Sequence, residues 1–411
     1  MQKVIFLVDM NAFYISCEMT RNPSLVGKPS AVAGDPKNRS GIILAASYEA
    51  RSFGVKTTMV IHEALKLCPD LQIVPPDHRF YESKSKQVMA ILSNYSPTVE
   101  QNSIDEAWLD MTGTEGLFGT PMEAAKKIMN EIKDNLGLWC SIGISENKFL
   151  SKMASELKKP LGITELWKND IPTKLWPLPI NAMYGIGKKT ADKLNALGIQ
   201  TIGDLAKYDR HQLVKVFGKY GDEMYLHANG HDTSLIQPHL SGEMKSIGRS
   251  TTLPEDVSNI EEAKLILLKL TDDIGMTARK YGKKARTVQI TLKYTDFKVV
   301  TRQMTVSPTC ATNDIYQAGC ALLEQNWNPL RPVRLIGISI SGFDENFALG
   351  QLSLFDLYEN KDNINNDKFE RIDKAIDKIR KKYGINKINR ASLIIKEDSN
   401  SHIKYRNKLQ P

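Results

Sequence analysis

Apolar positions in the first 168 residues predict strands and helices in alternation. Residues 4–8 (VIFLV) form a continuous apolar run, which is typical of a buried strand, and residues 98–111 alternate in part, as a two-stranded hairpin would. Residues 138–145 predict a further strand. Helical spacing indicates helices over 12–25, 61–69, 81–95, 121–137 and 147–159. This order predicts a ferredoxin-like α+β sheet with residues 12–80 inserted after its first strand.

The rest of the chain changes character twice. Residues 172–240 look all-helical with short glycine turns, and residues 244–343 return to strands alternating with helices. Beyond Asp344 the chain is polar, with one helix predicted over 366–382. We therefore expect four parts, with these boundaries: 1–168 (with the insertion at about 12–80), 169–240, 244–343 and 344–411.

Composition narrows the class of protein. The chain has 411 residues, enough for two to four domains, and its 41% hydrophobic and 25% charged residues are ordinary for a soluble protein. We expect no transmembrane helix and no signal peptide, because no apolar run is long enough. The cysteines are odd in number and scattered, which argues against disulfides and zinc and favours a cytoplasmic location: Cys17, Cys68, Cys140, Cys310 and Cys320.

Three acidic residues are candidates for a metal site. Asp9 ends the first strand, and Asp105 with Glu106 lies in the predicted hairpin. Neighbouring strands would bring these carboxylates to one sheet end, where oxygen ligands suit Mg²⁺ and phosphoryl transfer. Each acid could equally be an ordinary turn or surface residue, and the spacing alone leaves both interpretations open. We expect Asp110, in the same hairpin, to be structural.

Four ordered motifs resemble those of one enzyme family. DMNAFYISCE (9–18), ASYEAR (46–51), SIDEAWLD (103–110) and KKPLG (158–162) are similar to successive motifs of the Y-family DNA polymerases, the translesion enzymes. The resemblance spans residues 1 to about 355, and N-A-F-Y is closest to the UmuC and Gram-positive UvrX-type branch. It implies a right-hand polymerase with a ferredoxin-like palm, small fingers, a helical thumb, an α+β little finger and a polar tail.

The resemblance also implies a role for each acid. Asp9 and Asp105 would bridge two Mg²⁺ ions, the Met10 carbonyl would complete the ion on the nucleotide side, and Glu106 would bind the ion that activates the primer 3′-hydroxyl. This chain has Asn11 where many family members have Asp, a change that UmuC-like members share.

Five further residues match dNTP-binding positions of the family. Tyr14 matches the steric gate that excludes a ribose 2′-hydroxyl, and Phe13 would pack under the sugar or base. Tyr48, Arg51 and Lys159 match residues that contact the triphosphate. Without the motifs, the aromatic pair would be read as core packing and the cations as surface residues.

DNA-binding elements are expected in two places. Residues 182–199 have the form of a helix-hairpin-helix, in which Gly185, Gly187 and Lys188 would hold a phosphate, although a plain glycine turn is the alternative. KSIGRSTTLPEDV (245–257) resembles the entry to the little finger, where Arg249 would contact the DNA backbone.

A short peptide suggests a protein partner. QLSLF (351–355) fits the bacterial sliding-clamp motif through Gln351, Leu352, Leu354 and Phe355, with a short edge strand as the alternative. The sequence leaves open whether a UmuD-like accessory protein is needed.

The implied function is template-directed, error-prone translesion DNA synthesis from dNTPs, as part of DNA repair and SOS damage tolerance. Two other classes stay open at this point. One is a nucleotidyl cyclase, which also places two-metal carboxylates on a ferredoxin-like sheet; the other is a catalytically inactive, clamp-associated DNA-binding protein. The helix-hairpin-helix argues against the first, and the three intact carboxylates argue against the second.

The net charge of +8 is unevenly distributed. Residues 361–411 hold 14 basic and 7 acidic residues, residues 244–343 hold 14 and 9, and residues 344–360 hold four acids without a Lys or Arg. The first 243 residues are therefore balanced. Of the two cationic zones, the predicted little finger is expected to bind DNA, and the tail has no assigned role.

Overall fold

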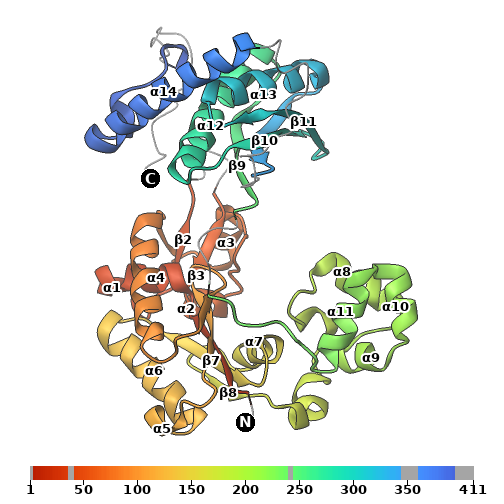
Figure 1. The fold of residues 1–411 in the computed structure, drawn as a ribbon. Coiled ribbons are helices and arrows are strands. Elements are labelled where there is room, and N and C mark those ends of the chain that lie inside the picture. The colour runs from red at the N-terminus through yellow and green to blue at the C-terminus, as the bar shows by residue number, and fades with distance from the viewer. Residues whose placement is uncertain (1–2, 36–40, 239–243, 344–359, 394–411) are drawn as a thin grey trace. The chain divides into compact units, whose positions relative to one another are not determined.

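The fold is seen in a computed structural model that describes residues 3–35, 41–238, 244–343 and 360–393 (Figure 1). The described residues form two compact units, one before residue 240 and one after it. Each unit is described by itself.

The first unit is built on a five-stranded sheet in the order β5-β6-β1-β7-β8. β1 is central and every one of its residues is buried, which is why its sequence reads as an unbroken apolar run. It is antiparallel to both β6 and β7, whereas β7 and β8 are parallel. The strands are β1 (Ile5–Met10), β5 (Val99–Gln101), β6 (Glu106–Asp110), β7 (Cys140–Ser145) and β8 (Ile163–Glu165).

Helices cover both faces of this sheet (Figure 1). Phe6, Val8 and Met10 alternate along β1 toward a core shared with α1, α4 and α6. α7 lies on the other face, against β7 and β1. The helices are α1 (Phe13–Arg21), α4 (His78–Ser93), α5 (Glu115–Phe118), α6 (Pro121–Leu136) and α7 (Lys148–Leu157).

The contact between α7 and β7 is unusually close. A Cβ atom at Gly143 of β7 would overlap the carbonyl oxygen of Ser151 and the amide nitrogen of Ser155, both in the backbone of α7. Only a residue without a side chain fits there. Gly143 therefore fixes how near the helix approaches the sheet.

The inserted segment has its own small sheet, in the order β3-β2-β4, and its own apolar core. The predicted helix over 12–25 is wrong at its end: α1 stops at Arg21, and a separate 3-10 turn begins at Pro23, whose ring cannot continue an α-helix. The elements are η1 (Pro23–Leu25), β2 (Ser30–Ala33), β3 (Ile43–Ala46), α2 (Tyr48–Ser52), α3 (Ile61–Leu67) and β4 (Gln72–Val74).

Residues 168–228 form a helical region, as predicted. Its core includes Phe149, Leu150 and Met153, so α7 belongs to this core as well as to the sheet. The elements are η3 (Lys168–Asp170), the π-helical η4 (Ile171–Leu175), η5 (Ile180–Ala182), α8 (Lys188–Ala196), α9 (Ile202–Lys207), α10 (Arg210–Phe217) and α11 (Lys219–Ala228).

Helix does not continue to residue 240, which corrects the expectation for 172–240. Residues 231–238 are irregular and return across the five-stranded sheet. Asp232 accepts a hydrogen bond from the Phe149 amide (2.9 Å), and Ile236 packs on Leu7 and Trp108. The segment covers apolar sheet surface that would otherwise meet water.

The second unit has a four-stranded sheet in the order β11-β10-β12-β9. α12 and α13 pack on one face of it, and α14 packs against these two helices (Figure 1). α14 begins earlier than the predicted residue 366. The elements are β9 (Ser246–Val257), α12 (Ile260–Lys280), β10 (Ala285–Tyr294), β11 (Val299–Thr309), α13 (Thr312–Asn326), β12 (Val333–Ser341), α14 (Asn360–Tyr383), η7 (Ile385–Lys387) and η8 (Ala391–Leu393). Among the described helices, none is long and apolar enough to cross a membrane.

The close packing of α7 can be tested by adding one methyl group. We expect Gly143→Ala to lower the free energy of unfolding by about 1–3 kcal/mol, because backbone atoms have to move apart. Urea denaturation followed by circular dichroism measures the change. Gly116→Ala is the matched control, because its Cβ would meet no atom within 4 Å. Equal unfolding midpoints for the two variants would contradict this packing.

Candidate active site

Two of the predicted acids are direct neighbours across two strands. Asp9 lies one residue before the end of β1, and Glu106 is the first residue of β6. The antiparallel register places these two residues opposite each other. Asp9 is largely buried, with 8% of its surface exposed. The sheet therefore brings together carboxylates that lie 97 residues apart in the sequence.

A lysine that sequence reasoning missed links these two acids. The Lys152 ammonium donates hydrogen bonds to Asp9 Oδ2 (2.8 Å) and to Glu106 Oε2 (2.6 Å). It also reaches Glu156 Oε1 at 2.9 Å, one turn along α7. A single cation thus lies between two carboxylates contributed by different strands.

Lys159 adds a second cation to the cluster. Its ammonium donates to Asp9 Oδ2 (2.9 Å) and to Glu156 Oε1 (2.8 Å). Burial alone would raise the pKa of Asp9, but the charges of Lys152 and Lys159 outweigh it and hold that pKa below its usual value. Burial opposes the charge on Lys152 too, yet the charge of Asp9 and the bonds to Asp9 and Glu106 raise its pKa. Asp9 and Lys152 therefore each favour the charged form.

Asp105 lies in the turn between β5 and β6, beside the other two acids. Its backbone carbonyl accepts a hydrogen bond from the Met10 amide (2.9 Å), which ties the turn to the end of β1. Its carboxylate accepts from the Ser103 hydroxyl at 2.5 Å. All three predicted acids are therefore at one end of the sheet, although Asp105 faces a different partner.

Asn11 holds the loop that carries Lys159. Its side-chain oxygen accepts from the Leu161 amide (2.9 Å), and its side-chain nitrogen donates to the Ser141 hydroxyl (3.0 Å). Sequence reasoning treated Asn11 only as a departure from the family pattern. An amide supplies a donor and an acceptor together, which a carboxylate cannot do when ionised.

The donor set is suited to a divalent cation. Asp9, Glu106 and Asp105 offer hard carboxylate oxygens at one sheet end, and Lys152 already places positive charge between two of them. In the described part of the chain, no three Asp, Glu, His or Cys side chains are gathered as a ready metal cluster. The hydrogen bonds above explain this, because lysines and Ser103 engage the same oxygens.

The predicted steric gate is part of an aromatic stack. The Tyr14 ring stacks on Tyr81 (ring centroids 4.4 Å apart, 15° between planes) and meets the edge of His78. The Tyr81 hydroxyl donates to Glu18 (2.6 Å), a buried acid that is also paired with Arg21. Burial raises the pKa of Tyr14, and the charge of Asp105 raises it further.

Phe13 and Tyr14 differ in exposure. Phe13 is buried in the core beneath β1, whereas Tyr14 is partly exposed beside the acids. The positions agree with a supporting ring and a ring that faces a ligand, but the two roles stay predictions.

Two predicted triphosphate ligands lie on the short helix α2. Ser47 caps this helix through the Ala50 amide, and the Arg51 guanidinium lies over the Tyr48 ring (4.8 Å to the centroid). Burial raises the pKa of Tyr48, on which the charges of Arg51, Lys159 and Asp9 also act. α2 therefore lies close to the carboxylate end of the sheet, and its cation faces the same region as Lys159.

The predicted helix-hairpin-helix has the expected local geometry. Gly185 has a positive φ of 89°, and Gly187 caps α8 with open space where a side chain would be. Lys188 and Lys189 are exposed in the first turn. Tyr220 of α11 braces the turn by donating to the Gly185 carbonyl (2.6 Å). Free amides and cations at a helix start suit a phosphate.

The other predicted contacts belong to the second unit or lie outside the described residues. Arg249 is exposed on β9, opposite Ile338 of β12. Gln351, Leu352, Leu354 and Phe355 lie outside the described residues, so the clamp peptide stays a prediction.

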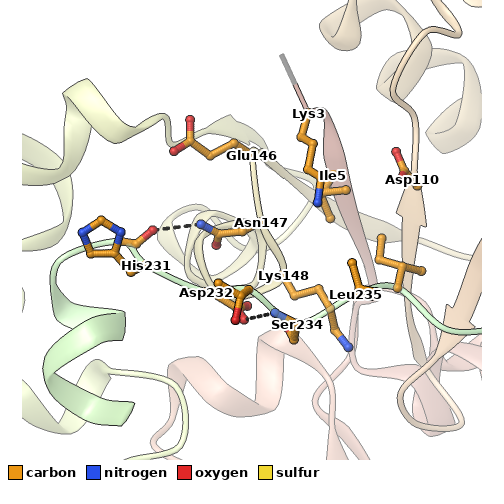
Figure 2. Close-up of a pocket in the computed structure, with 13 residues that line it drawn as sticks. Lys3, Ile5, Asp110, Glu146, Asn147, Lys148, His231, Asp232, Ser234 and Leu235 are labelled. Carbon is orange, nitrogen blue, oxygen red and sulfur yellow. Dashed lines mark hydrogen bonds between the residues drawn. The ribbon is translucent and has the colours of Figure 1, made fainter. Parts of the chain in front are cut away.

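The described structure also has a cleft at the other end of β1 and β6 (Figure 2). Ile5 and Asp110, the register partners at that end, line it together with Asn147 and Asp232. Asn147 donates to the Gly230 carbonyl (2.9 Å), so the cleft lies where residues 231–236 cross the sheet. It is distant from the carboxylates, and we assign it no catalytic role.

Comparison with known families gives three matches. The model of the impB/mucB/samB family matches residues 8–156, and the model of its C-terminal domain matches residues 244–354. The helix-hairpin-helix motif of the same family matches residues 168–199. The first match contains all three acids, and the third contains Gly185, Gly187 and Lys188.

Individual proteins agree with these matches. The chain is 61% identical to DNA polymerase IV of Alkaliphilus oremlandii over 96% of its length and all of that protein, and 59% identical to DNA polymerase IV of Clostridium kluyveri over 96% of its length and 99% of that protein. A solved Y-family DNA polymerase chimera superposes with a TM-score of 0.74 at 27% identity, covering 84% of this chain and 100% of the chimera. These names do not test the narrower UmuC or UvrX-type branch, which stays a prediction. Motifs, fold and relatives agree, and this chain is a member of the Y family of DNA polymerases, in its impB/mucB/samB group.

Proposed function

We propose that this chain performs template-directed translesion DNA synthesis at the Asp9–Glu106 end of the five-stranded sheet. It would transfer a nucleotide from a dNTP to a primer 3′-hydroxyl and release pyrophosphate. The observation that carries the proposal is the cluster in which Asp9 and Glu106 share the Lys152 ammonium, with Lys159 beside them. Ionised acids and phosphate-binding cations are there within reach of one another.

Two Mg²⁺ ions are the proposed cofactors. Asp9, Asp105, Glu106 and the Met10 carbonyl would hold them, because these are the oxygen donors at the sheet end. When bound, such ions lower the pKa of the attacking hydroxyl and neutralise charge on the leaving pyrophosphate. Metal binding requires Lys152 to release the acids, and the flexible lysine chain permits that movement.

The remaining site residues would hold the dNTP. Lys159 supplies a compact charge and Arg51 a planar fork for the triphosphate, while Tyr48 packs beneath Arg51. Tyr14 would lie where a ribose 2′-hydroxyl projects, supported by the stacked Tyr81 ring. Discrimination at this position would come from steric clash rather than from affinity.

Neither alternative function is favoured. A nucleotidyl cyclase has no use for a helix-hairpin-helix, yet residues 168–199 match that motif of the polymerase family. A catalytically inactive DNA-binding protein has no need to gather Asp9 and Glu106 around one buried lysine, yet Lys152 pairs with both. Primer extension without cyclic nucleotide formation separates the three cases.

The proposal extends to partners and to the division of the chain. The primer–template would contact Gly185, Gly187, Lys188 and Arg249, and residues 351–355 would bind the sliding clamp. A UmuD-like accessory protein is a further partner in the same proposal. We assign residues 1–168 to the palm with fingers at about 12–80, 169–240 to the thumb, 244–343 to the little finger, and 344–411 to the clamp peptide and tail.

Five buried, unpaired cysteines support a cytoplasmic location.

Removing a metal-binding acid should abolish synthesis without unfolding the protein. We expect Asp105→Ala and Glu106→Ala each to lower the rate of nucleotide incorporation by at least about 10²-fold, because metal ions contribute several kcal/mol to the transition state. Single-turnover primer extension measures this rate. Asp110→Asn is the matched control at the other end of β6, since an amide oxygen can still accept from Thr112. Full activity in the two alanine variants would remove the acids from the site.

The steric-gate role of Tyr14 predicts a change in sugar selectivity. We expect Tyr14→Ala to reduce discrimination against rNTPs by about 10-fold or more, because space opens where the 2′-hydroxyl would lie. The ratio of kcat/KM for dCTP and rCTP measures it. Tyr14→Phe keeps the ring and should keep the ratio. If the alanine variant has the same dCTP-to-rCTP ratio of kcat/KM as the parent, another residue is the gate.

Changing the predicted clamp peptide should remove clamp binding, and with it processivity, without affecting catalysis. We expect Leu354→Ala combined with Phe355→Ala to abolish clamp binding, because the two apolar side chains are the predicted anchors. Distributive synthesis without clamp should be unchanged. Surface plasmon resonance on immobilised clamp measures binding, with Leu357→Ala and Tyr358→Ala as the neighbouring control pair. Undiminished binding by the first variant would locate the clamp contact elsewhere.

A further inference from the structure

Helix α14 packs on its own unit through charged side chains. Arg279 of α12 donates to Asp377 (2.6 Å) and to Asp373 (3.1 Å), and the side chains of Arg279 and Asp373 are each only 4% exposed. Arg380 pairs with Asp272 of α12 at 2.7 Å, and Arg390 pairs with Asp373 at 2.6 Å. The buried side of this helix is thus an ion-pair network rather than an apolar stripe.

Asp373 has a second structural task. Its Oδ2 accepts the Thr312 amide (2.8 Å), the first residue of α13, so the carboxylate satisfies a free N–H at that helix start. Buried charges are costly unless each is paired and hydrogen-bonded, and here each is. The rotation of α14 about its own axis is therefore fixed, because turning the helix would leave a buried charge without its partner.

Three acids of α14 between residues 369 and 383 serve this inward network. Glu370 pairs with Lys284, Asp373 with Arg279 and Arg390, and Asp377 with Arg279; Glu370 and Asp373 are buried and Asp377 is half-buried. The cations point the other way: the exposed ones are Arg371, Lys374, Lys378, Lys381 and Lys382. Within the described residues, none of these five is in an ion pair.

Apolar side chains are exposed on a neighbouring side of the helix. Ile372 is 45% exposed, Ile379 is 38% exposed and Tyr383 is 59% exposed. A surface helix ordinarily buries such residues, whereas α14 exposes them and buries charged side chains such as Asp373 and Arg380. Between residues 369 and 383, where its side chains are described, the helix exposes five cations and three large apolar side chains and no acid, which makes this stretch a surface suited to a ligand.

We propose that this outer face of α14 is an additional DNA-binding surface that contacts the phosphate backbone. Charge complementarity selects the ligand, because the exposed charges of residues 371–382 are all positive and DNA is the polyanion on which the protein acts. Lys374, Lys378 and Lys382 recur every four residues, about 6 Å along the helix axis. That spacing is close to two phosphates of one strand, at about 3.4 Å each along the duplex axis.

This surface is separate from the contacts proposed above. The match to the C-terminal family domain ends at residue 354, before α14 begins. α14 packs on the helices of its unit, whereas Arg249 lies on β9 of the sheet. The proposal gives a role to part of the positive charge of residues 361–411, namely the cations that α14 holds in a fixed arrangement.

The test is the salt dependence of DNA binding by the full chain. We expect the triple variant Lys374→Ala, Lys378→Ala, Lys382→Ala to bind a fluorescein-labelled primer–template about 10-fold more weakly at low salt. The slope of log K against log salt should fall by about two to three, as expected for three lost phosphate contacts. Fluorescence anisotropy across a potassium chloride series measures both. Single-turnover incorporation at saturating DNA should be unchanged, because the carboxylate site is intact.

The matched control removes the same charge from another helix. Lys126→Ala, Lys127→Ala, Lys133→Ala neutralises three exposed cations of α6 and should leave the salt slope within about one unit of the parent. Equal slopes and affinities for the two triple variants would overturn the proposal while leaving the polymerase assignment intact. Normal DNA binding with lost clamp binding in the α14 variant would also overturn it and identify the face as a protein contact.

Discussion

The candidate active site depends on how closely one helix approaches one strand. Gly143 lets the backbone of α7 rest directly on β7, next to β1. At that distance Lys152 reaches Asp9 and Glu106, and the loop after α7 brings Lys159 to the same carboxylate. The opposite side of α7 places Phe149, Leu150 and Met153 in the core of the helical region. One rigid helix therefore couples the charge balance of the acids to the position of the predicted thumb.

In both units, charged side chains that are buried are paired with side chains of opposite charge. In the first, Asp9 is buried among apolar strands and stays ionised because two ammonium groups offset its lost hydration. In the second, Arg279 and Asp373 are buried together and each has further partners. The difference lies in the cation: lysine ammonium groups pair with Asp9, whereas the Arg279 guanidinium binds Asp377 of α14 through two hydrogen bonds.

Local sequence patterns predicted the frame of the site but not its contacts. The apolar run of β1 and the hairpin around Glu106 were enough to bring these acids together, because register follows from alternation. Lys152 was missed, although Lys152, Glu156 and Lys159 recur at helical spacing, because that spacing alone does not reveal which sheet the helix faces. The path of residues 231–238 was missed because it is set by a distant apolar patch at Leu7 and Trp108.

The orientation of α14 could not be predicted from its sequence, because its apolar residues do not mark its buried side. Hydrophobic periodicity assumes that apolar residues face inward, and here Ile372 and Ile379 face outward while Asp373 and Arg380 face inward. The assumption fails because Arg279 and Asp272 of α12 already present charges that need partners, and pairing them outweighs burial of two isoleucines. Net charge is misleading here in the same way: the acids between residues 369 and 383 pair inward, so the exposed charges of this stretch are all positive.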